Sequence, residues 1–215
     1  MQSNTIIEKL YLEIRKSIFN MIPEKCDEVY LYATVIVNEE DEESGEMFFF
    51  YYPKGIIRKR PINVYEIPSR FNIEEKSYMI LARKLYELLK QLRKQCKIYY
   101  NINWSNVTIS IKNIEFKAEY NCDDLVNSFY SEEDRKLIWQ YKYLNYPIEK
   151  ISKPDQEILD NYLAEAENGM HKIFSHIENF YKKTEKRTII YYNLEEDEAN
   201  SLKKEKKIKN QILKL

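Results

Sequence analysis

The chain has 215 residues, and its shares of hydrophobic residues (44%) and charged residues (32%) are those of a folded globular protein. Its formal net charge of −1 gives no overall attraction to nucleic acid or to an anionic membrane. Because it has only three glycines, it lacks the glycine-rich phosphate loops of the Rossmann and Walker types. Its three cysteines lie far apart, which argues against a disulfide framework or a structural zinc site and favours a reducing compartment.

The first predicted element is an amphipathic helix over residues 5–21, with its apolar residues three and four positions apart. Thr5 and Glu8 have the spacing of a capping box, and Pro23 ends the helix. This N-terminal segment has no apolar stretch typical of a signal peptide. No run approaches the roughly 18 apolar residues of a membrane-spanning helix, so we expect a cytoplasmic protein without a membrane partner.

Two strands joined by an acidic connection are predicted over residues 29–52. The first arm alternates between two faces with the period of two that is typical of a strand. The second arm, residues 47–52, is apolar on both faces, which favours a central strand covered on both sides. The connection is acidic at Glu39, Glu40, Asp41, Glu42, Glu43 and Glu46.

A short strand over 62–67, flanked by prolines, is predicted at a sheet edge. Asn72 is predicted to cap a long amphipathic helix that runs to about Cys96. A second hairpin, over 104–111 and 114–120, alternates apolar and polar residues as in a sheet with one solvated face.

Two more helices and a strand complete the prediction. Ser131 caps a helix that Pro147 stops, and a long helix runs from Pro154 to about Tyr181. Residues 188–194 predict a strand, and a lysine-rich tail follows it.

Because the strands come in antiparallel pairs, the predicted fold class is α+β. We expect an antiparallel sheet of about four or five strands, formed by two hairpins and packed with N-terminal, central and C-terminal helices. We divide the chain into a main domain over residues 1–150 and a C-terminal helical extension over 151–215, with a short strand and a charged tail.

Candidate catalytic residues are few. Glu115 and Lys117 on one strand have the pattern of half a nuclease metal site, but the preceding strand lacks the second acidic residue. His171 and His176 are five positions apart, whereas zinc ligands on one helix face are three or four apart. No histidine precedes residue 171, which excludes a Ser–His or Cys–His nucleophile there. We therefore expect no enzyme, no metal site and no cofactor.

Two acidic regions remain, the connection over 39–46 and the group of Glu115, Glu119, Asp123 and Asp124. Solvated loops and strand faces explain such regions in most proteins, and Asp123 and Asp124 suit the end of a hairpin. The alternative is a surface complementary to a basic protein partner. Nineteen tyrosines favour that alternative, because tyrosine is frequent in protein interfaces.

Six stretches match a known family in order and spacing: MIPEKCDEVYLYA, GEMFFFYYPKG, YEIPSRFNI, LYELLKQLRKQ, WSNVTISI and RKLIWQYKYLNYP. Over about residues 5–165 the chain resembles the YezG-type immunity proteins, the antitoxins of bacterial polymorphic toxin systems, including those that guard nuclease toxins exported by type VII secretion. It departs from the family pattern at Cys26, where an aromatic residue is expected, and its tail after about residue 166 is longer.

The resemblance implies stoichiometric inhibition: the protein would bind the toxin domain of its cognate effector in the cytoplasm of the producing cell and block it. Nuclease toxins present basic surfaces, so an acidic inhibitor is the expected counterpart. Charge and aromatic character, rather than the resemblance, select the predicted toxin-binding residues: Glu39, Glu40, Asp41, Glu42, Glu43, Glu46, Tyr51, Tyr52, Trp104, Asp123 and Asp124.

Two alternative functions stay open at the level of sequence. The first is a nucleic-acid-binding regulator that uses the basic loop over 58–60 and the lysine-rich tail, although the near-zero net charge predicts no direct nucleic-acid binding. The second is a metal-dependent nuclease that uses Glu115 and Lys117.

Overall fold

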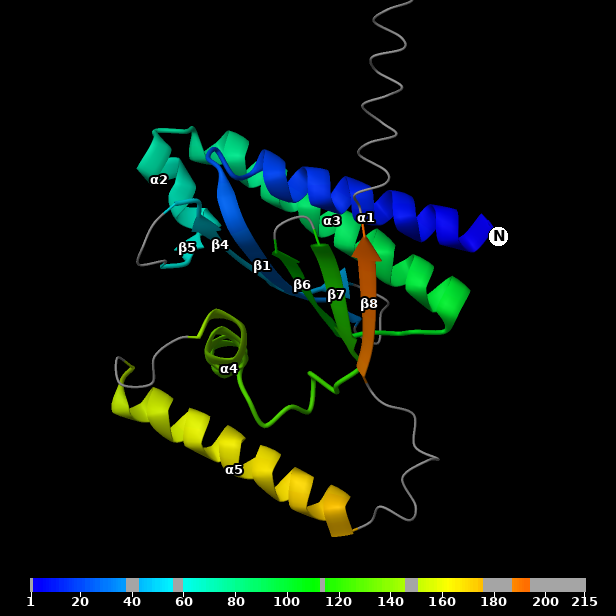
Figure 1. The fold of residues 1–215 in the computed structure, drawn as a ribbon, viewed down its shortest axis with the longest axis vertical. Helices are drawn as coiled ribbons and strands as arrows, with labels where there is room; N and C mark the ends of the chain where they lie inside the picture. The colour runs from blue at the N-terminus through cyan, green and yellow to red at the C-terminus, as the bar shows by residue number, and fades with distance from the viewer. Residues whose placement is uncertain are drawn as a thin grey trace, which may run out of the picture.

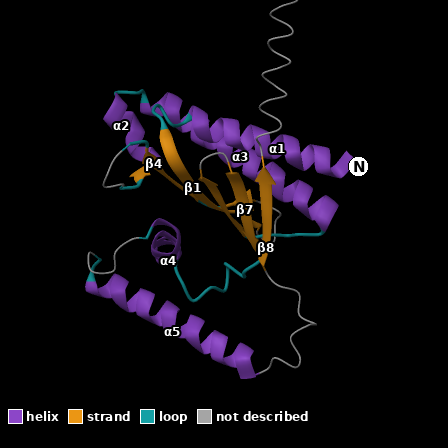
Figure 2. Ribbon diagram, in the orientation of Figure 1, coloured by secondary structure: helices purple, strands orange, loops and turns teal. Residues whose placement is uncertain are grey.

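The computed structural model describes residues 2–37, 43–55, 60–112, 115–145, 151–175 and 187–193. Its helices are α1 (Gln2–Asn20), α2 (Ile67–Phe71), α3 (Glu75–Tyr100), α4 (Glu132–Leu144) and α5 (Lys153–Ser175), with a short 3-10 helix η1 (Val64–Glu66). Its strands are β1 (Cys26–Thr34), β2 (Ile36–Val37), β3 (Glu43–Ser44), β4 (Met47–Pro53), β5 (Ile62–Asn63), β6 (Asn106–Lys112), β7 (Glu115–Asn121) and β8 (Arg187–Asn193). Helices and an antiparallel sheet confirm the α+β class (Figure 2).

Within the described ranges, one antiparallel sheet has six strands in the order β5-β4-β1-β6-β7-β8, slightly more than the predicted four or five. Leu31 of β1 lies opposite Phe49 of β4 on one side and Ile109 of β6 on the other. The first arm of the first hairpin, β1, is thus a central strand, whereas the second arm, β4, lies next to the short edge strand β5. Strand β8 extends the sheet by pairing with β7, so the chain beyond residue 150 contributes to the same sheet.

The larger core lies between the sheet and helices α1 and α3, which run along one side of it in Figure 1. Ile14 and Ile18 of α1 and Leu85 and Leu89 of α3 are fully buried there. The three-and-four periodicity of both helices places these side chains in one stripe, which is why both helices were predictable.

A second, aromatic core lies on the opposite face of the sheet, beneath α4. Its buried members are Tyr30, Tyr32, Phe48, Phe50, Trp139 and Leu144. The prediction of a solvated face on the second hairpin is therefore wrong for β6. Thr108 and Asn106 are buried there, because α4 packs over that face.

Helix boundaries differ from the prediction around Pro68. This proline lies in the first turn of α2, where the missing N–H costs no hydrogen bond, so only residues 62–63 remain as the edge strand β5. Asn72 is in the left-handed conformation (φ 53°) and ends α2 instead of capping α3, which begins at Glu75.

The helix α4 begins as predicted at Ser131, which forms a capping box with Asp134. It ends at Leu144, before Pro147, because Asn145 takes the left-handed conformation (φ 50°) that commonly terminates helices. Pro147 and the predicted helical residues 176–181 lie outside the described residues.

Candidate functional site

The acidic connection of the first hairpin is described only from Glu43 onward, and residues 39–42 lie outside the described part of the chain. The Glu43 carboxylate lies 3.7 Å from the amino group of Lys94 and 3.9 Å from that of Lys90, both on α3. Its side chain is only 17% exposed. Two lysines of the same molecule thus lie within ion-pair distance of Glu43, although Lys90 lies closer to Glu87 (2.7 Å), and together they reduce the charge that Glu43 can offer to a partner.

Glu46 links the start of β4 to α4. Its side chain is 11% exposed, and its Oε1 lies 3.8 Å from Nη2 of Arg135. Burial and then the neighbouring Glu132 carboxyl raise the pKa of Glu46 to about 8, against the opposing effect of Arg135. Nη1 of Arg135 also donates a hydrogen bond to the carbonyl oxygen of Tyr130, 2.7 Å away. Glu46 is therefore part of the packing of α4 and largely withdrawn from solvent.

Residues 122–131 connect the end of β7 to α4 (Figure 1). The carboxylate of Asp124 accepts hydrogen bonds from the backbone N–H groups of Val126 (3.2 Å) and Asn127 (3.1 Å), and from the side-chain amide of Asn127 (2.8 Å). Asp123 accepts from the side-chain amide of Asn106 at 3.5 Å, and both aspartates are exposed. As the sequence indicated, the pair ends a hairpin and lies in a loop.

The structure brings one residue of each predicted acidic region close to the Tyr32 hydroxyl. Burial first, and then the carboxyl groups of Glu46 and Asp123, raise the pKa of the Tyr32 phenol above its usual range, so both groups lie within electrostatic range of that hydroxyl. The first turn of α4 adds two exposed carboxylates beside them. We call this cluster the acidic corner, formed by Glu46, Asp123, Glu132 and Glu133. Because the pKa of Glu46 is raised to about 8, this carboxyl is mostly protonated at neutral pH, and the other three residues carry the negative charge of the corner.

The predicted aromatic anchors lie elsewhere. Tyr51 and Trp104 are fully buried in the larger core, and the Tyr51 hydroxyl donates to Glu24 at 2.7 Å. Tyr52 is partly buried, and its hydroxyl donates to the carbonyl oxygen of Leu144 at the end of α4. Because both side chains are fully buried in the larger core, Tyr51 and Trp104 stabilise the fold and present no surface to a partner in this structure.

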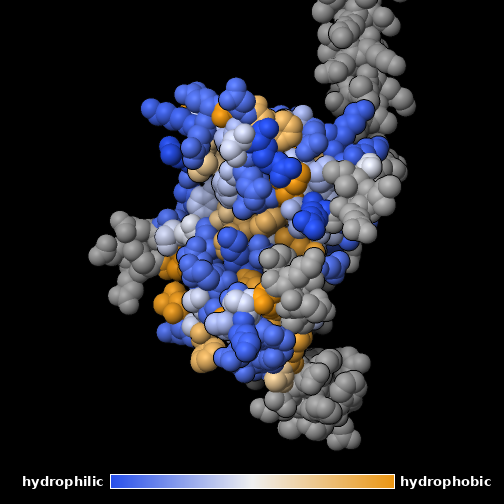
Figure 3. Space-filling model, turned by 90° about the vertical axis from the view of Figure 1, so that its left-hand side faces the viewer, coloured by the Kyte–Doolittle hydropathy of each residue, from blue (hydrophilic) through white to orange (hydrophobic). Residues whose placement is uncertain are grey.

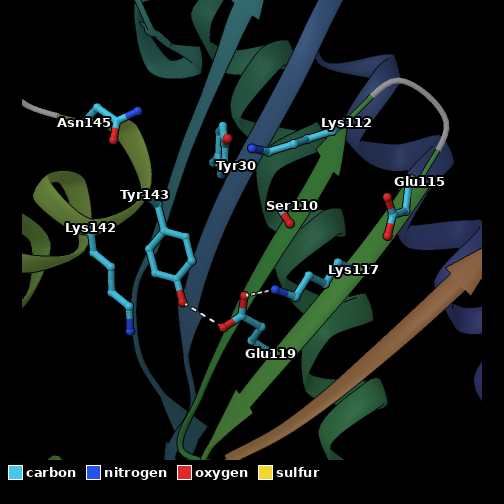
Figure 4. A pocket seen from close by; sticks show the side chains of 9 residues that line it. All are labelled: Tyr30, Ser110, Lys112, Glu115, Lys117, Glu119, Lys142, Tyr143 and Asn145. Carbon is cyan, nitrogen blue, oxygen red and sulfur yellow. Dashed lines mark hydrogen bonds and ion pairs between the residues drawn. The ribbon is translucent and has the colours of Figure 1, made fainter.

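Glu115 and Lys117 line a hollow of about 380 Å³ between the sheet and the end of α4 (Figure 4). The Lys117 amino group points to Glu119, 2.8 Å away, and the Tyr143 hydroxyl donates to the same carboxylate at 3.1 Å. Glu115 lies further along β7, away from this pair. Across the described ranges, no three His, Cys, Asp or Glu side chains are grouped to hold a metal ion. The geometry thus gives the metal-dependent nuclease interpretation no support.

The basic loop is described only at Arg60, which is exposed, while Arg58, Lys59, His176 and the lysine-rich tail lie outside the described residues. His171 belongs to α5. The nucleic-acid-binding alternative therefore gains no described surface beyond a single arginine.

Two features of the α4 region were not predicted from the sequence. Trp139 is a buried centre of the aromatic core, within 6.4 Å of four other ring centres. Val126 and Phe129, in contrast, are 73% and 84% exposed in the 122–131 loop. Figure 3 shows hydrophobic surface interleaved with hydrophilic surface at the height of α4 and α5. In the sequence, Val126 and Phe129 stand among Asp, Asn and Ser residues, and this polar surrounding was the signal for their exposure.

The chain is similar to proteins of a known family. A model of the family described as "Immunity protein YezG-like" matches residues 7–160. The chain belongs to the YezG-like immunity protein family. Immunity protein YezG of Bacillus subtilis strain 168 is 30% identical over 159 residues, which are 74% of this chain and 99% of that protein. Immunity protein YezG of Bacillus spizizenii strain W23 is 28% identical over 159 residues, which are 74% of this chain and 93% of that protein.

The YezG-like match includes both cores, the acidic corner and the 122–131 loop, and it ends within α5. Strand β8 lies beyond it. None of the helices in the described ranges combines the length and the apolar character needed to cross a membrane. The family membership implies a cognate toxin as the partner, so the exposed features near α4 are the natural candidates for the contact.

Proposed function

We propose that this YezG-like immunity protein neutralises the nuclease domain of a secreted polymorphic toxin by binding it within the producing cell. The observation that supports a nuclease target is the acidic corner, where carboxylates far apart in the sequence gather beside α4. Nucleases bind polyanions through basic surfaces, and an acidic protein surface competes for the same cations. Inhibition of this kind requires occlusion of the nuclease and no chemistry by the inhibitor.

The proposed contact surface consists of the acidic corner, Asp124 and the connection over 39–42. Its exposed carboxylates are Asp123, Glu132 and Glu133. Glu46 is largely buried and contacts Arg135 of α4. Tyr51 and Trp104 are not part of it because they are buried. Glu43 contributes less than the sequence suggested, because Lys90 and Lys94 already contact it.

The direct test first searches the genes next to this one for a secreted protein with a C-terminal toxin domain, and then mixes that purified toxin domain with the purified chain. We expect a stable complex. Nuclease activity should fall as the inhibitor is added and be abolished at one inhibitor per toxin domain. The chain alone should show no salt-dependent binding to generic DNA at micromolar concentration. A toxin domain that binds the chain yet cleaves no nucleic acid would overturn the nuclease assignment and leave the immunity role intact.

Charge reversal tests the placement of the surface. Glu132→Lys with Glu133→Lys should weaken toxin binding by roughly tenfold or more at low salt, mainly through a slower association rate. The matched control is Glu13→Lys with Glu75→Lys, the same charge change at exposed positions of α1 and α3. Equal binding by both double variants would exclude the acidic corner as the contact.

A further inference from the structure

The 122–131 loop exposes its apolar residues to an unusual degree. Phe129 and Val126 are 84% and 73% exposed, the highest values among the large hydrophobic side chains that the structure describes. Single exposed hydrophobic residues are common on protein surfaces. Two of them on one short loop, each more exposed than Ile98 or Ile80 of α3, form a projecting apolar tip. We call this segment the docking loop (residues 122–131).

The docking loop is held by its own hydrogen bonds. Asp124 accepts from the N–H groups of Val126 and Asn127, which orders the first half of the loop. The hydroxyl of Ser128 accepts from the N–H of Tyr130 at 3.2 Å. A partner that binds this tip therefore finds it already ordered and loses little affinity to conformational entropy.

The end of the loop is anchored to two helices. The carbonyl oxygen of Tyr130 accepts from Arg135 of α4, and the Tyr130 hydroxyl donates to Glu165 of α5 at 2.9 Å. The Phe129 ring meets the Tyr130 ring edge-on, with ring centres 5.5 Å apart. These contacts hold the base of the Phe129 side chain while leaving most of its ring in solvent.

The charges around the tip define the chemistry of its partner. Residues 121–134 contain five carboxylates, at Asp123, Asp124, Glu132, Glu133 and Asp134, and no lysine, arginine or histidine. The cation that follows, Arg135, is only 17% exposed and is engaged by Glu46 and by the carbonyl oxygen of Tyr130. Such a segment repels nucleic acid and anionic lipid. A second copy of the chain would bring like charges together across a symmetric contact. A basic protein surface with an apolar recess is the complementary occupant.

We propose that Phe129 and Val126 are the apolar anchor of the toxin contact and insert into a recess ringed by basic residues on the nuclease domain. This inference rests on the proposed function and adds to it the side chains that dominate the affinity. Buried aromatic anchors surrounded by a polar rim commonly carry most of the binding energy of protein interfaces. Here the carboxylates of the acidic corner form the polar rim and raise the association rate. Phe129 and Val126 lower the dissociation rate.

The test measures binding of the toxin domain from the neighbouring gene to the full chain by calorimetry. Phe129→Ala should weaken binding by roughly tenfold, and the double variant Phe129→Ala with Val126→Ala by roughly thirtyfold or more. Phe129→Leu should retain most of the affinity. The heat capacity change of binding should be less negative for the double variant, because less apolar surface is buried. The matched control, Ile98→Ala with Ile80→Ala on α3, should bind like the wild-type chain.

The outcomes separate the two proposals. Equal affinity of the double variant and the wild-type chain overturns the anchor and leaves the proposed function standing. Failure of the wild-type chain to bind the toxin domain overturns both. A wild-type chain that is dimeric alone and becomes monomeric in the double variant also overturns the anchor, since the tip would then join two copies. Because the mutated side chains are largely in solvent, the thermal unfolding midpoints of all variants should agree within experimental error.

Discussion

The indole N–H of Trp139 donates a hydrogen bond to the hydroxyl oxygen of Thr108, 3.1 Å away, and thereby joins α4 to the middle of the sheet. The same indole packs against the rings of Tyr32, Phe48 and Phe50. Because α4 also carries the end of the docking loop through Arg135, the position of the proposed toxin contact depends on this small aromatic core.

Truncation of Trp139 should destabilise the whole domain. Trp139→Ala removes the centre of the aromatic core and should lower the free energy of unfolding by about 3–5 kcal/mol, as for other buried aromatic residues. Thr108→Val keeps the shape but leaves the buried indole N–H without its partner, at a cost of about 1–3 kcal/mol. Urea titration followed by tryptophan fluorescence and circular dichroism measures both. A loss below about 1 kcal/mol for Trp139→Ala would show that α4 is not seated as described.

Gly45 has a conformation that other residues rarely adopt, with φ at 152°, and a Cβ there would collide with the carbonyl oxygen of Thr34 and the hydroxyl of Tyr86. The neighbouring backbone is paired, since the N–H of Thr34 donates to the carbonyl oxygen of Glu46 at 3.0 Å. Gly45→Ala should therefore reduce the free energy of unfolding by more than about 1 kcal/mol. Gly55→Ala is a useful comparison, because Gly55 also has a positive φ (80°), whereas a Cβ there meets no atom within 4 Å, so this variant carries the backbone strain without the collision. Equal losses for both variants would contradict the steric explanation.

The buried carboxyl of Glu46 predicts a pH dependence. Its pKa is raised from 4.5 to about 8, mainly by burial, so the folded state binds this proton more tightly than the unfolded state. The stabilisation is complete below about pH 4.5 and declines as the pH rises to about 8. Glu46→Gln should remove this decline. The free energy of unfolding of the variant should therefore rise relative to that of the wild-type chain between about pH 5 and 8. Chemical denaturation at a series of pH values measures both free energies, and the same pH dependence for the two proteins would contradict the raised pKa.

Asp124 is predicted to order the docking loop without supporting the core. Asp124→Ala removes the acceptor for the N–H groups of Val126 and Asn127, so hydrogen exchange at these two amides should accelerate by roughly tenfold or more. The free energy of unfolding should change by less than about 1 kcal/mol, because the residue is exposed. Asp124→Asn keeps one carbonyl acceptor and should show a smaller effect. Unchanged exchange in the alanine variant would show that other contacts order the loop.

Local patterns made much of the fold predictable. The periodicities of α1, α3 and the first hairpin record which side chains face a core, and the capping box at Ser131 marks the start of α4. The alternation of the second hairpin predicted only one of the two covered faces of β6, because its other face is polar in sequence and covered by α4. The predicted role of Asn72 as the N-cap of α3 is wrong. An asparagine before a helix resembles an N-cap, whereas here its left-handed backbone ends α2. Pro68 likewise has two local interpretations, a strand edge or a first helical turn, and packing selected the second.

By itself, the sequence determined the α+β class, the order of the main elements and the resemblance to the YezG-like immunity proteins. All three depend on residue types and spacings along the chain. The tertiary structure decided that Tyr51 and Trp104 are buried, that Glu46 and Asp123 both lie near the Tyr32 hydroxyl, and that Phe129 projects into solvent. These features depend on strand pairing and on the seating of α4 against the sheet. Both are contacts between distant residues, which no local pattern encodes.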